Sequence, residues 1–246
     1  MKQILRSLLV VACIAAAENL AEAAQEPTVD SILAKHVESV GGKAALEKIT
    51  SRVIKGKVEN ALLPSGIEWT FFAKSPSKQL VVMEIPGLGT SQDGFDGETA
   101  WSRNMAGVRV KTGEELAKVK RDSTFRRELN YKTLFPNLTY KGTQTIGNDE
   151  ANVLESVPSA DSKERFFFSK KSGLLVRQES EFKSGQGRVV SNAELSDYRD
   201  VDGIKQAYLI KGAVSAGGQE MEFTLRVSEI QHNLKIEDAR FGKPTS

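Results

Sequence analysis

The feature that most constrains this fold is a two-residue alternation of apolar and polar side chains that recurs after Arg52. The last long segment shows it most clearly, because its apolar members Met221, Phe223, Leu225 and Val227 alternate with polar residues. Such alternation is typical of strands that bury one face. Residues that tolerate positive φ separate the later segments, at 148–149, 172–173, 184–187, 202–203 and 217–218. The pattern therefore predicts antiparallel strands joined by hairpins.

Two segments have helical spacing instead. The first spans 28–48 and is broken at Gly41 and Gly42, and the second is predicted over 114–131 after a capping box at Thr112 and Glu115. About ten strands with one apolar face must curl and be covered. The sequence thus predicts an α+β fold, a strongly curved antiparallel sheet forming an open half-barrel of about ten strands, with short helices closing the concave face. Two short helices would leave part of that face lined but unfilled as a ligand cavity, unless side chains fill the space.

The first residues have the features of a secretion signal. Lys2 and Arg6 precede an apolar run over 8–17, and Ala21 and Ala23 provide the small residues that a signal peptidase reads. We expect a cleaved signal peptide at 1–24, a single domain over 25–246 and a periplasmic location. An alternative interpretation makes Cys13 the lipidated residue of a lipoprotein.

Composition excludes several classes of function. One Cys and two His are too few for a structural zinc site, an iron–sulfur cluster or internal disulfides. With 34 basic and 32 acidic residues, the net positive charge is too small to favour nucleic-acid binding. The Ser-x-x-Lys match at 75–78 and the calcium-like run at 200–203 are better explained as turns. We therefore expect no metal, no cofactor, no catalytic residue and a non-enzymatic protein.

Several motifs occur in an order that resembles a known superfamily. They include Phe72 to Pro76, Asp96-Gly97 followed by Trp101, and segments at 172–177, 197–203 and 233–244. This order is similar to that of the LolA/LolB/RseB-like superfamily of periplasmic lipoprotein carriers and lipid-binding sensors. The resemblance implies an open half-barrel whose apolar interior holds acyl chains. The chain departs from the pattern at Ser75, where carriers often place Arg before the proline, and the motifs assign no interior arginine.

These observations predict a binding protein that holds a lipid or the acyl chain of a lipoprotein. The expected hydrophobic wall, which could equally be ordinary core, consists of Trp69, Phe71, Trp101, Phe166, Phe168, Tyr208, Phe223, Leu225 and Val227. Lys118, Lys120 and Arg121 are predicted either to form a solvated helix face or to contact lipid headgroups or an acidic partner. The alternative function is an envelope sensor or scaffold that grips another protein through an apolar or basic patch on the outside. Peripheral membrane contact and a monomeric state are also expected.

Overall fold

The computed structural model describes residues 26–63, 65–185 and 187–245. The predicted signal peptide and Cys13 lie outside the described residues. The helical elements are α1 (Val29–Ser39), α2 (Gly42–Lys48), α3 (Gly113–Asp122), η1 (Arg127–Leu129), α4 (Tyr131–Leu134) and η2 (Asp238–Phe241). The strands are β1 (Ser51–Glu59), β2 (Ile67–Lys74), β3 (Lys78–Ile85), β4 (Gly89–Phe95), β5 (Ala100–Asn104), β6 (Gly107–Val110), β7 (Thr139–Ile146), β8 (Asp149–Ser159), β9 (Ser162–Ser169), β10 (Leu175–Ser184), β11 (Gly187–Val201), β12 (Ile204–Ala216) and β13 (Gln219–His232).

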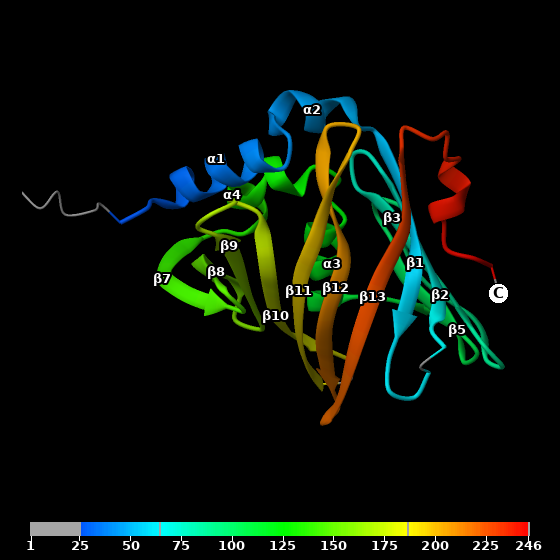
Figure 1. Ribbon diagram of the computed structural model, residues 1–246. Coiled ribbons are helices and arrows are strands. Elements are labelled where there is room, and N and C mark those ends of the chain that lie inside the picture. Colours follow the sequence, from blue (N-terminus) through cyan, green and yellow to red (C-terminus); the bar gives the residue numbers. More distant parts are fainter. Residues whose placement is uncertain (1–25, 64, 186, 246) are drawn as a thin grey trace, which may run out of the picture.

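All of these strands belong to one antiparallel sheet. Its order is β6-β5-β4-β3-β2-β1-β13-β12-β11-β10-β9-β8-β7, so β1 pairs with β13 in the middle and β6 and β7 are the edges. The sheet curls around α3, while α1 and α2 lie across one end of the curl (Figure 1). The predicted α+β class and the open, curved antiparallel sheet are therefore confirmed.

The sheet has thirteen strands, more than the predicted number of about ten. The short strands β4, β5 and β6 lie in a segment, 89–110, that contains little apolar alternation. They form consecutive hairpins with β3 and with one another, and Phe95, Ala100 and Trp101 are buried there although the segment shows little periodicity.

Cross-strand partners show that the two faces of the sheet differ in chemistry, since directly opposed residues project to the same side. One row consists of Leu195, Ile210, Leu225, Val58 and Ile67 on β11, β12, β13, β1 and β2. The row on the opposite face consists of Arg177, Glu194, Lys211, Thr224 and Glu59 on β10 to β13 and β1. The predicted facing of Leu225 is therefore confirmed, and it is 7% exposed. Met221 at the end of the same strand remains 50% exposed.

Helices α1 to α4 pack on the apolar face, here called the inner face, whereas η2 packs on the opposite face with Val53 and Leu80. One core cluster joins Ile32 and Leu33 of α1 and Phe135 to Phe166 and Phe168 of β9. A second joins Val40 and Leu46 to Ala73 on β2, to Phe125 and to Ile204 on β12. The wide sheet is thus covered mainly at the end where α1 and α2 lie.

The second helical segment differs from its prediction. The helix expected over 114–131 is divided into α3, η1 and α4, because the Phe125 amide donates to the Pro76 carbonyl (3.0 Å) and turns the chain toward the β2–β3 connection. The predicted capping box is wrong. The Thr112 side chain makes no cap hydrogen bond, and Glu115 accepts from Arg109 (2.6 Å) instead.

Candidate functional site inside the curved sheet

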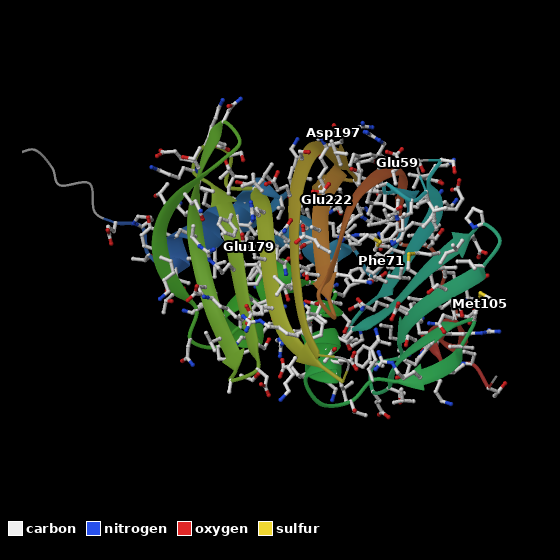
Figure 2. All side chains as sticks on the ribbon, turned by 90° about the horizontal axis from the view of Figure 1, so that it is seen from below. Glu59, Phe71, Met105, Glu179, Asp197 and Glu222 are labelled. Carbon is white, nitrogen blue, oxygen red and sulfur yellow. The ribbon has the colours of Figure 1, made fainter. Side chains whose placement is uncertain are left out.

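Five of the predicted wall residues belong to the inner-face rows of β2 and β13. They are Trp69, Phe71, Phe223, Leu225 and Val227. Trp69 and Phe71 stack with ring centroids 6.0 Å apart and an interplanar angle of 9°. Viewed from below, Phe71 lies within the curl (Figure 2). Trp69, Phe71 and Phe223 all remain partly exposed, as do Val58 and Ile210 beside them.

Two further wall residues, Phe166 and Phe168, are part of the closed core. They are 0% and 1% exposed and contact Tyr131 edge-on at 5.1 and 5.7 Å. A packed aromatic cluster of this kind fills the space that a ligand would need. These two side chains therefore support the fold under α1 and α4.

Trp101 lies on the opposite face of the sheet. Its indole Nε1 donates to the Phe241 carbonyl (3.0 Å), and it is buried with Val53 and Leu80 beneath the C-terminal segment. The structure therefore separates Trp101 from Trp69 and Phe71. Tyr208 is partly exposed and carries the exposed Arg199 guanidinium 4.3 Å above its ring, so it contributes a surface contact.

The three predicted headgroup cations have different environments. Lys118 donates to the fully buried Glu164 (3.1 Å) and to Asp122 (2.8 Å), and Arg121 donates to Glu114 (2.8 Å). Their side chains are only 15% and 12% exposed, so this face of α3 is not solvated. Lys120 is exposed.

Burial governs the electrostatics of this α3–sheet contact. Burial raises the pKa of the Glu164 carboxyl, and the Lys118 ammonium opposes that rise. Burial by itself would lower the pKa of Lys118, but the carboxylates of Asp122 and Glu164 reverse the effect and raise it. The contact is thus ionic and hydrogen-bonded, with Ser180 also donating to Glu164 (3.0 Å).

Sequence reasoning missed an arginine on the inner face. Arg52 of β1 is opposed by Ala73 on β2 and by His232 on β13, and its Cζ lies 5.7 Å from the Phe125 ring centroid. The sequence could have indicated this position, because Arg52 precedes Ile54, Gly56 and Val58 at two-residue spacing and residues so spaced on a strand share one face.

A hydrogen-bonded chain fixes the base of this arginine. Arg52 Nε donates to His232 Nε2 (3.2 Å), and His232 Nδ1 lies 3.0 Å from Asp202 Oδ2. Burial, together with the Arg52 charge, lowers the pKa of His232. The neutral imidazole therefore accepts from Arg52 and donates to Asp202.

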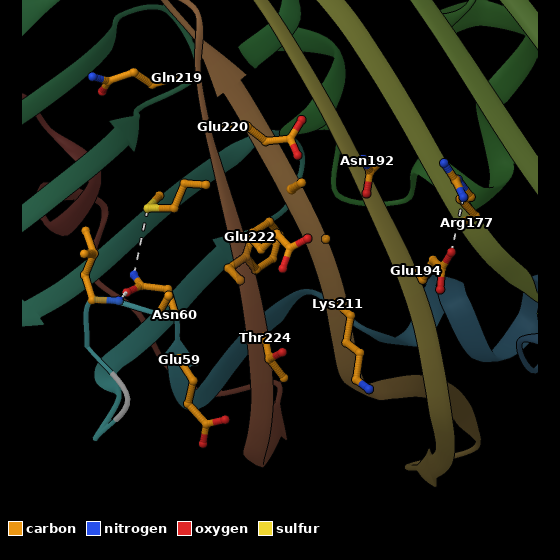
Figure 3. A pocket seen from close by; sticks show the side chains of 16 residues that line it. Glu59, Asn60, Arg177, Asn192, Glu194, Lys211, Gln219, Glu220, Glu222 and Thr224 are labelled. Atoms are coloured by element: carbon orange, nitrogen blue, oxygen red, sulfur yellow. Dashed lines mark hydrogen bonds and ion pairs between the residues drawn. The ribbon is translucent and has the colours of Figure 1, made fainter.

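The outer face has an open depression of about 1330 Å³ across β10 to β13 and the β1–β2 connection. Polar side chains from neighbouring strands project together into it, including Glu59, Glu194, Lys211 and Glu222 (Figure 3). Arg177 pairs with Glu194 at 3.2 Å. Its lining holds more acidic than basic residues, whereas the scaffold alternative predicted an apolar or basic patch.

Within the described ranges, no group of His, Cys, Asp and Glu has the arrangement of a metal site. Nor does any helix in this part of the chain have the length and apolar character needed to cross a membrane.

Comparison with known proteins adds evidence on the fold. No protein-family model and no curated protein matches the sequence. Among solved structures, a DUF1329 family protein from Desulfovibrio piger is 14% identical, with a TM-score of 0.55 over 87% of this chain and 97% of that one. A protein domain described as outer membrane lipoprotein-sorting, from Vibrio parahaemolyticus, is also 14% identical, with a TM-score of 0.56 over 85% and 95%.

A LolA superfamily protein from Nitrosomonas europaea is similar at the same level. It is 14% identical, with a TM-score of 0.51 over 88% of this chain and 98% of that one. At such identity the likeness concerns the fold. The chain therefore shares the fold of a LolA superfamily protein, as its sequence motifs suggested.

Proposed function

We propose that this protein binds an apolar chain, either a lipid or the acyl chain of a lipoprotein, along the inner face of β12, β13, β1 and β2. The observation that carries the proposal is that aromatic and aliphatic side chains in the inner rows of these strands remain partly exposed. They include Val58, Trp69, Phe71, Ile210 and Phe223. The opposite-face row of these strands includes Lys211, Thr224 and Glu59 instead.

The energetics favour such a ligand. Each buried CH₂ group contributes about 0.8 kcal/mol, so a long chain lying on this wall gains affinity without any specific polar contact. The closed cluster around Phe166 and Phe168 already fills the space over β8 to β10. The binding wall is therefore the set Trp69, Phe71, Phe223, Leu225 and Val227, with Val58 and Ile210 added.

The remaining parts of the proposal concern the cell. We place the protein in the periplasm as a monomeric, non-enzymatic carrier or lipid-binding protein. The exposed Lys120 is the one predicted headgroup cation left on the surface of α3, and it could give a peripheral, salt-sensitive contact with anionic membranes.

A native reporter makes the proposal testable. The chain has two tryptophans, Trp69 on the proposed wall and Trp101 buried on the other face. Methyl 9,10-dibromostearate is a neutral acyl chain whose bromine atoms quench nearby indoles. It should quench the wild-type emission saturably and should leave the Trp69→Phe variant, in which only Trp101 emits, unquenched.

A second variant tests the position of the wall. Val58→Trp places a bulky ring on the same face of β1 and should weaken binding of the ester while the protein stays folded, because a partly exposed position can accept the larger side chain. Absence of saturable quenching in the wild type, or equal quenching of Trp69→Phe, would exclude this site.

A further inference from the structure

The cationic side chains near the helices on the inner side of the sheet differ in whether a carboxylate lies close to them. Lys118 and Arg121 each contact a carboxylate, and Arg127 lies 3.8 Å from Asp122 while donating to Gln178. Arg126 donates to three backbone carbonyls at the end of α2. Arg52 alone among these five has a neutral imidazole as its single hydrogen-bond partner in the described residues.

Glu128 does not complete this site. It attracts Arg52 electrostatically, yet the two form no ion pair, and Glu128 Oε2 is buried without a hydrogen-bond partner. A guanidinium presents five N–H donors in a planar fork, and Arg52 uses one of them. Its Nη groups therefore remain available for a bidentate anion.

The surroundings of Arg52 define what kind of anion could reach it. The inner face continues along β1 and β2 from Arg52 as the pairs Ile54–Phe71, Gly56–Trp69 and Val58–Ile67. From Arg52 to Val58 the strand advances by six residues, or about 20 Å. A cation thus sits at one end of an apolar track as long as an extended fatty acyl chain.

We propose that Arg52 binds the anionic headgroup of a single-chain amphiphile whose hydrocarbon lies along this track. The inference rests on the proposed function and adds to it the chemical class of the ligand. Charge-assisted bidentate bonds to the Nη groups would match the otherwise unpaired charge. His232 is a positioning residue, because its Nε2 accepts from Arg52 Nε and so holds the guanidinium in place without using its Nη groups.

The test compares two ligands that differ only in headgroup charge. Free 9,10-dibromostearate should quench Trp69 with a dissociation constant about tenfold lower than that of its methyl ester, equivalent to about 1.4 kcal/mol. In Arg52→Met the two constants should become equal while that of the ester stays within about twofold of wild type. Lys55→Met, on the outer face of the same strand, is the matched control and should retain the tenfold preference.

The outcomes separate this inference from the proposed function. If acid and ester bind the wild type equally, or if Arg52→Met keeps the preference, the headgroup assignment is overturned although the wall still binds. If neither ligand binds, the proposed function itself fails. The wild-type comparison needs no variant, so it holds even if Arg52→Met does not fold. Hexadecyl phosphate, added as a competitor, shows which headgroup the site prefers. Tighter binding than that of the free acid assigns phosphate, and weaker binding assigns carboxylate. Binding weaker than that of the ester would contradict both.

Discussion

At the scale of single residues, two glycines of the sheet are required by close approach between strands. A Cβ at Gly212 would lie 2.1 Å from the Asn192 carbonyl oxygen, and one at Gly56 would lie 2.4 Å from the Arg226 carbonyl oxygen. Gly56 also adjoins the register shift between β1 and β13. Both therefore permit the local curvature where the binding wall is formed.

Gly212→Ala should destabilise the protein by roughly 1–3 kcal/mol, because the clashing atom belongs to the backbone and cannot rotate away. Gly185→Ala is the control, since nothing lies within 4 Å of its Cβ position, and it should change stability little. Urea unfolding measures both. Equal free energies of unfolding for the two variants would contradict this role of Gly212.

A second residue-scale prediction concerns His36. It is buried, its Nδ1 lies 3.0 Å from the Gly173 carbonyl, and burial lowers its pKa. The unfolded chain takes up this proton near pH 6.5, before the folded protein does. The stability that depends on neutral His36 is thus complete above about pH 6.5 and falls as the pH drops toward the lowered value.

Unfolding free energies at pH 7.5 and 5.5 should therefore differ less in His36→Phe than in wild type, because the variant lacks that titrating group. His232→Gln, which removes the other histidine, shows whether its own lowered pKa contributes in the same direction. An unchanged difference in His36→Phe would show that His36 is not the titrating group.

At the scale of elements, α3 packs on the sheet with its charged side chains facing inward. Lys118 and Arg121 contact β9 and its neighbours, and the Glu164 carboxylate that receives Lys118 is 0% exposed. This reverses the common arrangement, in which the apolar stripe of a helix faces the sheet. The helix therefore depends on its ion pairs for its position.

Lys118→Met should destabilise the protein by about 3–5 kcal/mol, because it leaves Glu164 buried without its cation. Lys120→Met on the same helix is exposed and should stay within about 0.5 kcal/mol of wild type. The double variant Lys118→Met, Glu164→Met should recover part of the loss, since Glu164 is then absent and Asp122 keeps Arg127 at 3.8 Å. Thermal and urea unfolding measure the stability of all three variants. A small loss of stability in Lys118→Met would show that the ion pair with Glu164 does not hold α3 in place.

At the scale of the whole molecule, β1 joins β13 in one sheet, so that distant parts of the chain line one wall. The predicted signal peptide also concerns the whole molecule, because it would determine the compartment in which the protein meets its ligand. Removing 1–24 takes away Lys2, Arg6, Glu18 and Glu22 and leaves the net charge at +2.

Intact mass of protein recovered from the cell envelope should therefore show a chain that begins near residue 24 or 25 and lacks Cys13. A chain that begins at Cys13 with added acyl mass would instead place the protein among the lipoproteins.

The sequence alone determined which residues alternate, where the hairpins turn and which side of β13 is apolar, because these depend on a period of two and on local φ preferences. It could not assign Trp101 to the opposite face, pair Lys118 with Glu164 or identify Arg52 as the unmatched interior cation. Those facts depend on register and packing between segments far apart in the chain, as in the 180 residues that separate Arg52 from His232. Only the tertiary structure decided them, since a side chain's partner is set by the strand that pairs beside it.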